Sequence, residues 1–300
     1  MGYTGWSPST YDSYAKATST KSRAAIFTSS SIDEYLDPKK FTVRESRDST
    51  ANPSSTPIII GVDVTGSMGS LAEQIVKRDL GTIMGEIYTR LPVPNPHILA
   101  SAIGDAQAGD DAPFQATQFE SDISIADQME KFYIEGGGGG NRGESYLLAW
   151  YFAAYRTDCD AITKRGKKGY LFTVGDEAPL TTITKDEIEN YFGDKIQDDI
   201  KGEDLLDIVK QNWHVFHIVV KPHGRFTHDP KYWTDLLGDG VIVLQDNSAL
   251  GEVIVSTLQV VNGEDVDAVA SSWSGSTAVV VRDAIKGLVK AGENEDIVAL

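Results

Sequence analysis

The sequence has 300 residues and a formal net charge of -17, from 44 acidic and 27 basic residues. A chain this acidic repels nucleic acid and anionic membranes, and we therefore expect neither as a partner. Cations and basic protein surfaces are the expected partners. The single cysteine, Cys159, excludes an intramolecular disulfide. No signal-type apolar segment opens the sequence, and no stretch reaches the ~20 apolar residues of a membrane-spanning helix, which predicts a cytoplasmic protein.

The first 56 residues are rich in Ser, Thr and charged residues, with scattered aromatic residues such as Trp6 and Tyr11. This composition predicts an extension over residues 1–56 that is partly ordered by itself and lies along the main domain or docks onto a partner. At Pro57 the composition changes: the stretch PIIIGVD is an apolar, β-branched run typical of a strand buried on both faces.

Similar runs recur along the rest of the chain and alternate with helical patterns. The expected strands are 57–63, 97–104, a polar edge strand at 114–121, 169–175, 213–220 and 241–245. The expected helices are 70–91, 144–155, 185–192, 203–211 and 248–261. This alternation predicts an α/β fold with a doubly wound, mostly parallel six-stranded sheet and helices on both faces. We place this domain at residues 57–262 and a C-terminal helical extension at 263–300, with one more helix at 277–290.

Polar residues directly follow the first predicted strand, in the stretch GVDVTGSMGS. Asp63, Thr65 and Ser67 form a D-x-T-x-S pattern, and alternate residues of an extended turn project to the same side. One carboxylate and two hydroxyls, completed by water, suit a hard divalent cation such as Mg²⁺. The alternative is that Asp63 or Ser67 simply caps the helix that follows.

Two further loops are expected at the same sheet edge. Asp176 follows the strand at 169–175 in FTVGDEAP, where the alternative is a turn with a capping acid. The glycine-rich loop GGGGGNRGES precedes the helix at 144–155 and offers Asn141, Glu144 and Ser145. In a phosphate-binding loop Glu144 would stand at the lysine position and repel phosphate, which argues against a nucleotide site. The alternative for this glycine-rich loop is a flexible linker without a ligand.

These three loops together resemble the von Willebrand factor type A domain over about residues 57–262. The metal-ion-dependent adhesion site of that family consists of a D-x-S/T-x-S turn, a threonine from a second loop and an aspartate after a later strand. Asp63, Thr65 and Ser67 match the turn, and Asp176 matches the aspartate. The glycine-rich loop holds no threonine, so Asn141, Glu144, Ser145 or a water molecule is expected to supply that ligand.

The resemblance implies a bound Mg²⁺, or alternatively Mn²⁺ or Ca²⁺, and a protein partner that presents a carboxylate to the ion. Further details are similar to the prokaryotic and phage-encoded intracellular branch of the family, which often pairs with AAA+ ATPases. These details are the absence of a signal and a disulfide, and the stretches IGDA, QFESD and the Gly-rich ES element. The partner that this resemblance implies is an AAA+ ATPase or an assembly subunit. The chain could also form a homo-oligomer. If it is phage-encoded, we expect it to be associated with the virion.

Other functions remain as alternatives. One is a structural or scaffold protein of a virion or other assembly with a vestigial metal site. Another is a metal-dependent phosphohydrolase of the haloacid dehalogenase type, which needs a second aspartate where this chain has Thr65, so we expect no enzyme. A zinc site on the histidines near 214–228 is disfavoured, because His214 and His217 would face opposite sides of a strand. Asp105, after the second strand, also lies at the expected edge of the site.

Overall fold

A six-stranded sheet forms the centre of the computed structural model, which describes residues 5–68, 70–137, 143–220 and 231–288. The order across the sheet is β10-β9-β6-β2-β3-β4, and all neighbours are parallel except β3 and β4. The strands are β2 (Thr56–Asp63), β3 (Pro96–Ile103), β4 (Phe114–Ala116), β6 (Gly169–Gly175), β9 (Trp213–Val220) and β10 (Val241–Leu244). The predicted α/β class and the mostly parallel, doubly wound sheet are confirmed.

Strand order reverses at β2. From β2 the chain moves outward through β3 to β4, and then returns to place β6 on the other side of β2, followed by β9 and β10. In register, Val62 of β2 lies beside Ala102 of β3 and Val174 of β6. The crevice at the carboxyl ends of β2 and β6 is therefore the switch point, where open α/β sheets bind ligands.

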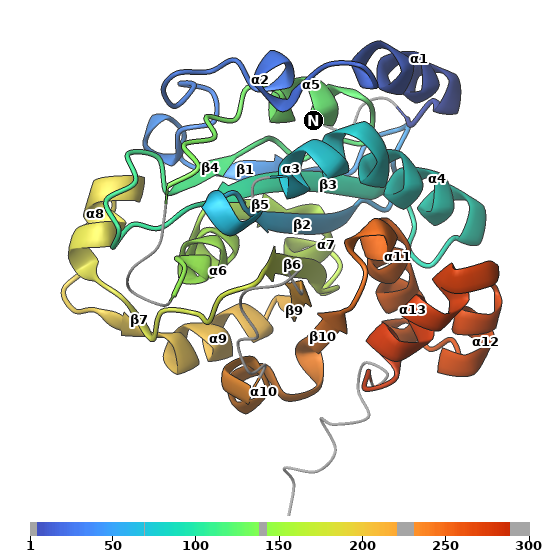
Figure 1. Ribbon diagram of the computed structural model, residues 1–300. Coiled ribbons are helices and arrows are strands. Elements are labelled where there is room, and N and C mark those ends of the chain that lie inside the picture. Colours follow the sequence, from blue (N-terminus) through green and yellow to red (C-terminus); the bar gives the residue numbers. More distant parts are fainter. Residues whose placement is uncertain (1–4, 69, 138–142, 221–230, 289–300) are drawn as a thin grey trace, which may run out of the picture.

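Helices cover both faces of this sheet, as Figure 1 shows. Alternate residues of β2 point to opposite faces: Ile58 and Ile60 join one apolar core and Ile59 joins the other. The first core includes residues of α3 (Leu71–Gln74), α4 (Leu80–Arg90), α5 (Ser124–Met129) and α11 (Leu250–Val261). The second includes residues of α6 (Tyr146–Tyr155), α8 (Lys185–Phe192), α9 (Gly202–Lys210) and α10 (Lys231–Leu237).

Two predicted elements differ most from the structure. The edge strand expected at 114–121 ends at Ala116, because two amides beyond Thr117 bond to side chains: Gln118 N–H donates to Gln128 Oε1 and Phe119 N–H to Gln118 Oε1, both at 2.8 Å. Pairing with β3 resumes only as an isolated bridge between Glu120 and Ile98. The helix expected at 70–91 is interrupted by a π-helical turn, η3 (Ile75–Asp79), which separates α3 from α4. Within that turn Asp79 is buried and accepts a hydrogen bond from Gln74 Nε2 at 2.7 Å.

The N-terminal segment packs along the α/β domain. Its first helix, α1 (Pro8–Thr18), places Tyr11 against Gly81 of α4, where a Cβ would lie 2.0 Å from the tyrosine ring. Further on come α2 (Arg23–Ile26), the 3-10 turn η1 (Pro38–Lys40) and β1 (Arg44–Ser46), which pairs in parallel with β5 (Thr157–Cys159). The glycine at position 81 thus makes room for an aromatic anchor of the extension.

The C-terminal segment forms α12 (Val266–Ser271) and α13 (Gly275–Ile285), whose buried residues join the core on the α11 side of the sheet. The helix predicted at 277–290 begins earlier, at Gly275, and ends earlier, at Ile285. The remaining elements are α7 (Asp160–Thr163), β7 (Thr182–Ile183), β8 (Ile200–Lys201) and the 3-10 turns η2 (Gly66–Met68), η4 (Gly238–Gly240) and η5 (Asn247–Ala249). Among the described residues, no helix has the length and apolar character needed to cross a membrane.

Candidate metal site

Asp63 ends β2 and lies fully buried at the switch point. Its Oδ1 accepts hydrogen bonds from the Thr65 backbone N–H at 2.9 Å and from the Thr65 hydroxyl at 2.6 Å. Its Oδ2 accepts a hydrogen bond from the Tyr146 hydroxyl at 2.8 Å. Burial raises the pKa of Asp63 to about 7 despite these three donors. A nearby positive charge would stabilise the ionised form of this firmly held and poorly solvated carboxylate.

The two hydroxyl groups of the turn each face a carboxylate. Thr65 donates its proton to Asp63, and Ser67 donates to Asp176 Oδ1 at 3.0 Å. A hydroxyl that donates its hydrogen bond to a carboxylate keeps its oxygen lone pairs, and these can coordinate a metal ion. Ser67 is exposed whereas Asp63, Thr65 and Asp176 are buried, so the site opens to solvent on the Ser67 side.

The turn does not serve as the cap of the following α-helix. α3 begins at Leu71, and the residue in the N-cap position is Ser70. Asp63 instead closes a tight turn on the amide of Thr65, two residues on. The alternative of a plain helix cap at Asp63 or Ser67 is therefore wrong for this helix. The hydrogen bond between Ser67 and Asp176 instead joins two loops that are distant in sequence.

Glu144 comes from the second loop and lies on the inner wall of this site. Its side chain is nearly inaccessible, with 3% of the residue exposed, and the Thr65 hydroxyl is within hydrogen-bonding reach. Burial, followed by the charges of Asp63 and Asp105, raises the pKa of Glu144 to about 9. Its Oε2 has no hydrogen-bond partner among the described residues. The end of β2 and the second loop thus bring Asp63 and Glu144 close enough to interact electrostatically.

Ser145 and Asp105 connect the second loop to the end of β3. The Ser145 hydroxyl oxygen accepts a hydrogen bond from the Ala106 N–H at 3.0 Å, and the Ser145 N–H donates to the Gly104 carbonyl at 3.3 Å. Asp105 is fully buried, and its Oδ1 accepts from the amides that follow it in the loop. Ser145 therefore anchors α6 to this loop, while the third candidate of the second loop, Asn141, lies outside the described residues.

Glycines allow the loops to approach one another closely. The Gly66 N–H donates to the Gly137 carbonyl at 2.9 Å, and a Cβ on Gly66 would lie 3.2 Å from the Gly136 carbonyl oxygen. The glycine-rich loop thus starts directly over the D-x-T-x-S turn. At the end of β6, a Cβ on Gly175 would lie 1.9 Å from the Tyr146 hydroxyl. Close backbone approach is the reason for glycine at both positions.

Tyr146 also contributes to the candidate site, although no sequence motif pointed to it. It is the first residue of α6, a helix with most positions buried, and its ring makes edge contacts with His217 and Trp233 at centroid distances of 4.9 and 5.3 Å. Burial and the Asp63 carboxylate raise the pKa of Tyr146, so its hydroxyl stays protonated and donates to Asp63. The only sequence signal was unspecific: a buried phenol needs a hydrogen-bond partner, but α6 holds three tyrosines, at 146, 151 and 155.

The histidines of β9 do not form a zinc site. His217 is buried, stacks on Trp233 and shares a hydrogen bond with Thr173 at 2.8 Å, and burial lowers its pKa well below the usual value. His214 stacks instead on Tyr170, whose ring belongs to the core on the other face of the sheet. The prediction that His214 and His217 face opposite sides is confirmed, and His223 and His228 lie outside the described residues.

The donor set present fits a hard divalent cation. It combines the carboxylates of Asp63 and Asp176 with two hydroxyls, and it leaves a buried carboxylate oxygen of Glu144 to be satisfied. No cluster of three or more Asp, Glu, His or Cys side chains in the described residues has the arrangement of a metal site by itself. Hydroxyl oxygens are therefore an essential part of this donor set, which suits Mg²⁺ with several waters.

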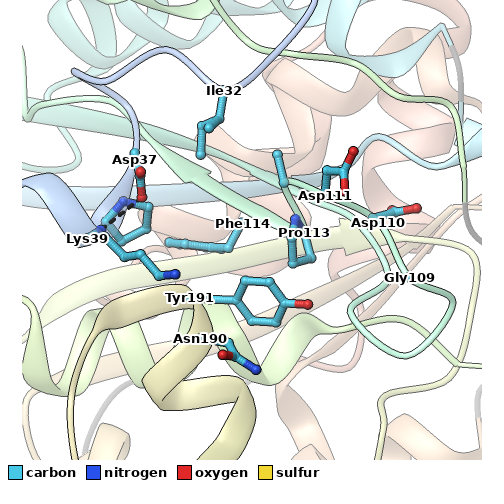
Figure 2. A pocket seen from close by; sticks show the side chains of 12 residues that line it. Ile32, Asp37, Lys39, Gly109, Asp110, Asp111, Pro113, Phe114, Asn190 and Tyr191 are labelled. Atoms are coloured by element: carbon cyan, nitrogen blue, oxygen red, sulfur yellow. Dashed lines mark hydrogen bonds between the residues drawn. The ribbon is translucent and has the colours of Figure 1, made fainter.

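A separate groove lies beyond the loop that follows Asp105. Its volume is about 500 Å³, and it is lined by η1, the start of β4, the end of α8 and loop residues that include Asp111. Figure 2 shows Lys39 and Tyr191 extending into the same space, with Phe114 at its back. Lys39 and Asp111 are both exposed, so the wall carries both signs of charge and does not define one class of ligand. The crevice at β2 and β6 remains the candidate site.

Comparison with known proteins gives similarity in fold only. The sequence matches no protein-family model and no curated protein. The structure is similar to the pilus adhesin SpaC from Lactobacillus rhamnosus GG in its open conformation, with 10% identity and a TM-score of 0.47 over 72% of this chain and 31% of the adhesin. It is also similar to a von Willebrand factor type A protein from Catenulispora acidiphila, with 13% identity and a TM-score of 0.38 over 71% of this chain and 44% of that one. This chain thus spans less than half of each.

Proposed function

We propose that this chain is a Mg²⁺-dependent protein-interaction module of the von Willebrand type A kind, with its metal-ion-dependent adhesion site at the end of β2. The main support is the pairing of two hydroxyls with two buried carboxylates, Thr65 with Asp63 and Ser67 with Asp176. Asp63, Thr65, Ser67 and Asp176 would hold the ion, and Mn²⁺ or Ca²⁺ would use the same oxygens.

The bound ion would supply a Lewis-acidic position for an oxygen ligand from outside the chain. The exposed Ser67 side of the site gives the access that such a ligand needs. In the type A family this ligand is a carboxylate, and we propose the same for the partner of this chain. The intracellular branch that the sequence resembles points to an AAA+ ATPase or an assembly subunit as that partner, in the cytoplasm or in a virion.

We propose no catalytic role for the site. A phosphohydrolase of the haloacid dehalogenase type would need an aspartate at position 65, and here that position carries a threonine whose hydroxyl donates to Asp63. Asp63 itself is fully buried and accepts three hydrogen bonds, which leaves it poorly placed to attack a phosphoryl group. The geometry supports ion binding better than nucleophilic chemistry.

The test is calorimetric titration of the metal-free full chain with Mg²⁺ and Mn²⁺, repeated on Asp63→Ala. We expect the wild type to bind about one ion per chain, as a single set of ligands implies. The variant should lose this binding while circular dichroism shows the same fold. Unchanged ion affinity in the folded variant would refute the proposed site. Absence of binding in the wild type would favour the alternative, a structural component of an assembly with a vestigial site.

A further inference from the structure

A further pocket, of about 480 Å³, lies at the amino ends of three parallel strands, the sheet edge opposite the candidate ion site. Thr56 of β2, Tyr170 of β6 and His214 of β9 line it, and each is the first or second residue of its strand. Strand β2 runs from Thr56 to Asp63, so at about 3.3 Å per residue the two sites lie roughly 20 Å apart. The pocket is thus distinct from the ion site, and its volume is within the range of about 300–1,000 Å³ typical of small-molecule sites.

The charge of this lining is opposite to that of the whole chain. Arg165, Lys167 and Lys168 line the pocket, and no Asp or Glu is among its described lining residues. The three cations belong to the stretch KRGKKG, residues 164–169, in a chain whose net charge is -17. Cations held this close together in the sequence repel one another, which costs free energy unless an anion offsets it. The grouping therefore favours an anionic ligand.

The loop that carries the two lysines has a defined conformation. Where α7 ends, the Lys167 N–H donates to the Ala161 carbonyl at 2.8 Å. Gly166 has a φ of 61°, the left-handed conformation in which glycine commonly follows a helix. Where β6 begins, the Gly169 N–H donates to the Asn212 carbonyl at 2.9 Å. The backbone at residues 167 and 168 is thus held on both sides, and the position of the lysines does not depend on a loose surface turn.

Arg165 connects this loop to the segment that precedes β2. Its guanidinium forms an ion pair with Asp48 and donates a hydrogen bond to the Ser55 carbonyl. Asp48 in turn accepts hydrogen bonds from the Ser55 N–H at 2.9 Å and from the Ser55 hydroxyl at 2.8 Å. Arg165 thus holds two walls of the pocket together. Lys167 is exposed and Lys168 is half-buried, so a ligand from solvent can reach both side chains.

Aromatic and apolar groups complete the lining on the strand side. Tyr170 and His214 are neighbours in the register of β6 and β9, and their rings stack at a centroid distance of 5.2 Å. The Tyr170 hydroxyl is held by Asn262 at the end of α11, whose Nδ2 donates to it at 2.7 Å. Val93 and Pro94 add apolar surface. A cationic loop beside rings and apolar surface suits an organic molecule with an anionic group better than a bare ion.

We propose that this pocket binds a small phosphate ester, with the phosphate group at Lys167 and Lys168 and the organic part against Tyr170 and His214. A phosphate monoester carries roughly 1.5 to 2 negative charges at neutral pH and offers three acceptor oxygens, so it matches several cations better than a single carboxylate does. A nucleic acid strand does not fit, because it needs a long basic surface and the chain as a whole is acidic. The proposal is independent of the ion site.

The test is calorimetric titration of the full chain at low salt with inorganic phosphate, ribose 5-phosphate and adenosine 5′-monophosphate. The wild type should bind at least one of the two esters, and more tightly than inorganic phosphate. Lys167→Gln combined with Lys168→Gln should raise the Kd of that ester about tenfold or more, as loss of hydrogen bonds to a charged group implies. The control combines Lys195→Gln with Lys210→Gln, two exposed lysines outside the pocket. It has the same net charge and should keep the wild-type Kd.

A variant without a change in charge tests the organic side of the pocket. Ser54 is half-buried in the lining, and Ser54→Phe puts a ring into the space for the ester. It should weaken binding of the ester more than binding of inorganic phosphate. Equal affinity of the wild type for inorganic phosphate and both esters would overturn the organic part of the proposal.

Two results would overturn the proposal as a whole. One is that none of the three probes binds to the wild type. The other is that both lysine pairs weaken binding equally, because net charge alone would then explain it. Asp63→Ala should bind the ester with the wild-type Kd, so this proposal and the proposed ion site can fail separately.

Discussion

Gly175→Ala should damage both stability and ion binding, because the added methyl group has no space. Its Cβ would lie 1.9 Å from the Tyr146 hydroxyl and 2.7 Å from Cζ of the same ring, whereas favourable contacts of carbon atoms begin at about 3.5 Å. The ring of Tyr146 is fully buried and packs edge-on against the stacked rings of His217 and Trp233, so it has little room to move. Any shift large enough to relieve the overlap also breaks the hydrogen bond of Tyr146 to Asp63.

The expected cost combines two effects. Overpacking of a filled core costs about 1–3 kcal/mol. Loss of a hydrogen bond to a charged group adds about 1.5–3 kcal/mol. We therefore expect the free energy of unfolding to fall by roughly 3 kcal/mol or more, measured by urea denaturation of the metal-free protein. Mg²⁺ affinity should fall as well, because Asp63 loses the group that holds its Oδ2 in place.

Two controls separate this mechanism from a general effect of alanine. Gly85 in α4 has open space around a Cβ, so Gly85→Ala should be neutral or stabilising by up to about 1 kcal/mol. Tyr146→Phe removes the atom nearest to the new methyl group. In that background Gly175→Ala should cost less than in the wild type, by about 0.5 kcal/mol or more of coupling. Full stability and unchanged ion affinity in Gly175→Ala would refute the proposed placement of Tyr146.

Two other predictions follow from the same structure. Burial raises the pKa of Asp63 to about 7 and of Glu144 to about 9, above the values of an unfolded chain, so the folded metal-free protein holds protons that the unfolded chain has lost and should lose stability as pH rises. Thermal unfolding in chelator should show this loss from about pH 4, where unfolded carboxyls titrate, to about pH 9. Saturating Mg²⁺ should suppress the loss, and equal slopes with and without Mg²⁺ would count against the site. Tyr11→Ala should cost about 3 kcal/mol in urea denaturation, because it removes the ring packed on Gly81; a change below about 0.5 kcal/mol would mean that the extension adds little to the fold.

The order of buried strands and helices could be predicted from the sequence because its signals are local. Runs such as PIIIGVD and GYLFTVG are apolar at consecutive positions, which suits strands covered on both faces, and both became central strands, β2 and β6. The edge strand was harder to predict. After Ala116 the amides of Gln118 and Phe119 bond to side chains, and that competition leaves no periodic trace in the sequence.

In the candidate site, too, some residues could be predicted from the sequence and others could not. Asp63, Thr65 and Ser67 could be selected from the sequence because they share one turn, and Asp176 because it directly follows a strong strand pattern. Tyr146 could not be selected, because its role depends on a contact with Asp63 across 83 positions and on the absence of a side chain at Gly175. No local pattern encodes that three-residue packing.

The sequence by itself determined the class of fold and the chemistry available at one sheet edge, since strand burial, helix periodicity and the oxygen-rich turn are properties of neighbouring residues. Only the tertiary structure decided how those oxygens are used. It placed the hydroxyls of Thr65 and Ser67 on two different carboxylates and buried Glu144 beside them. The physical reason is that desolvation and hydrogen-bond pairing depend on which distant loops meet, and the order of the strands in the sheet sets that meeting.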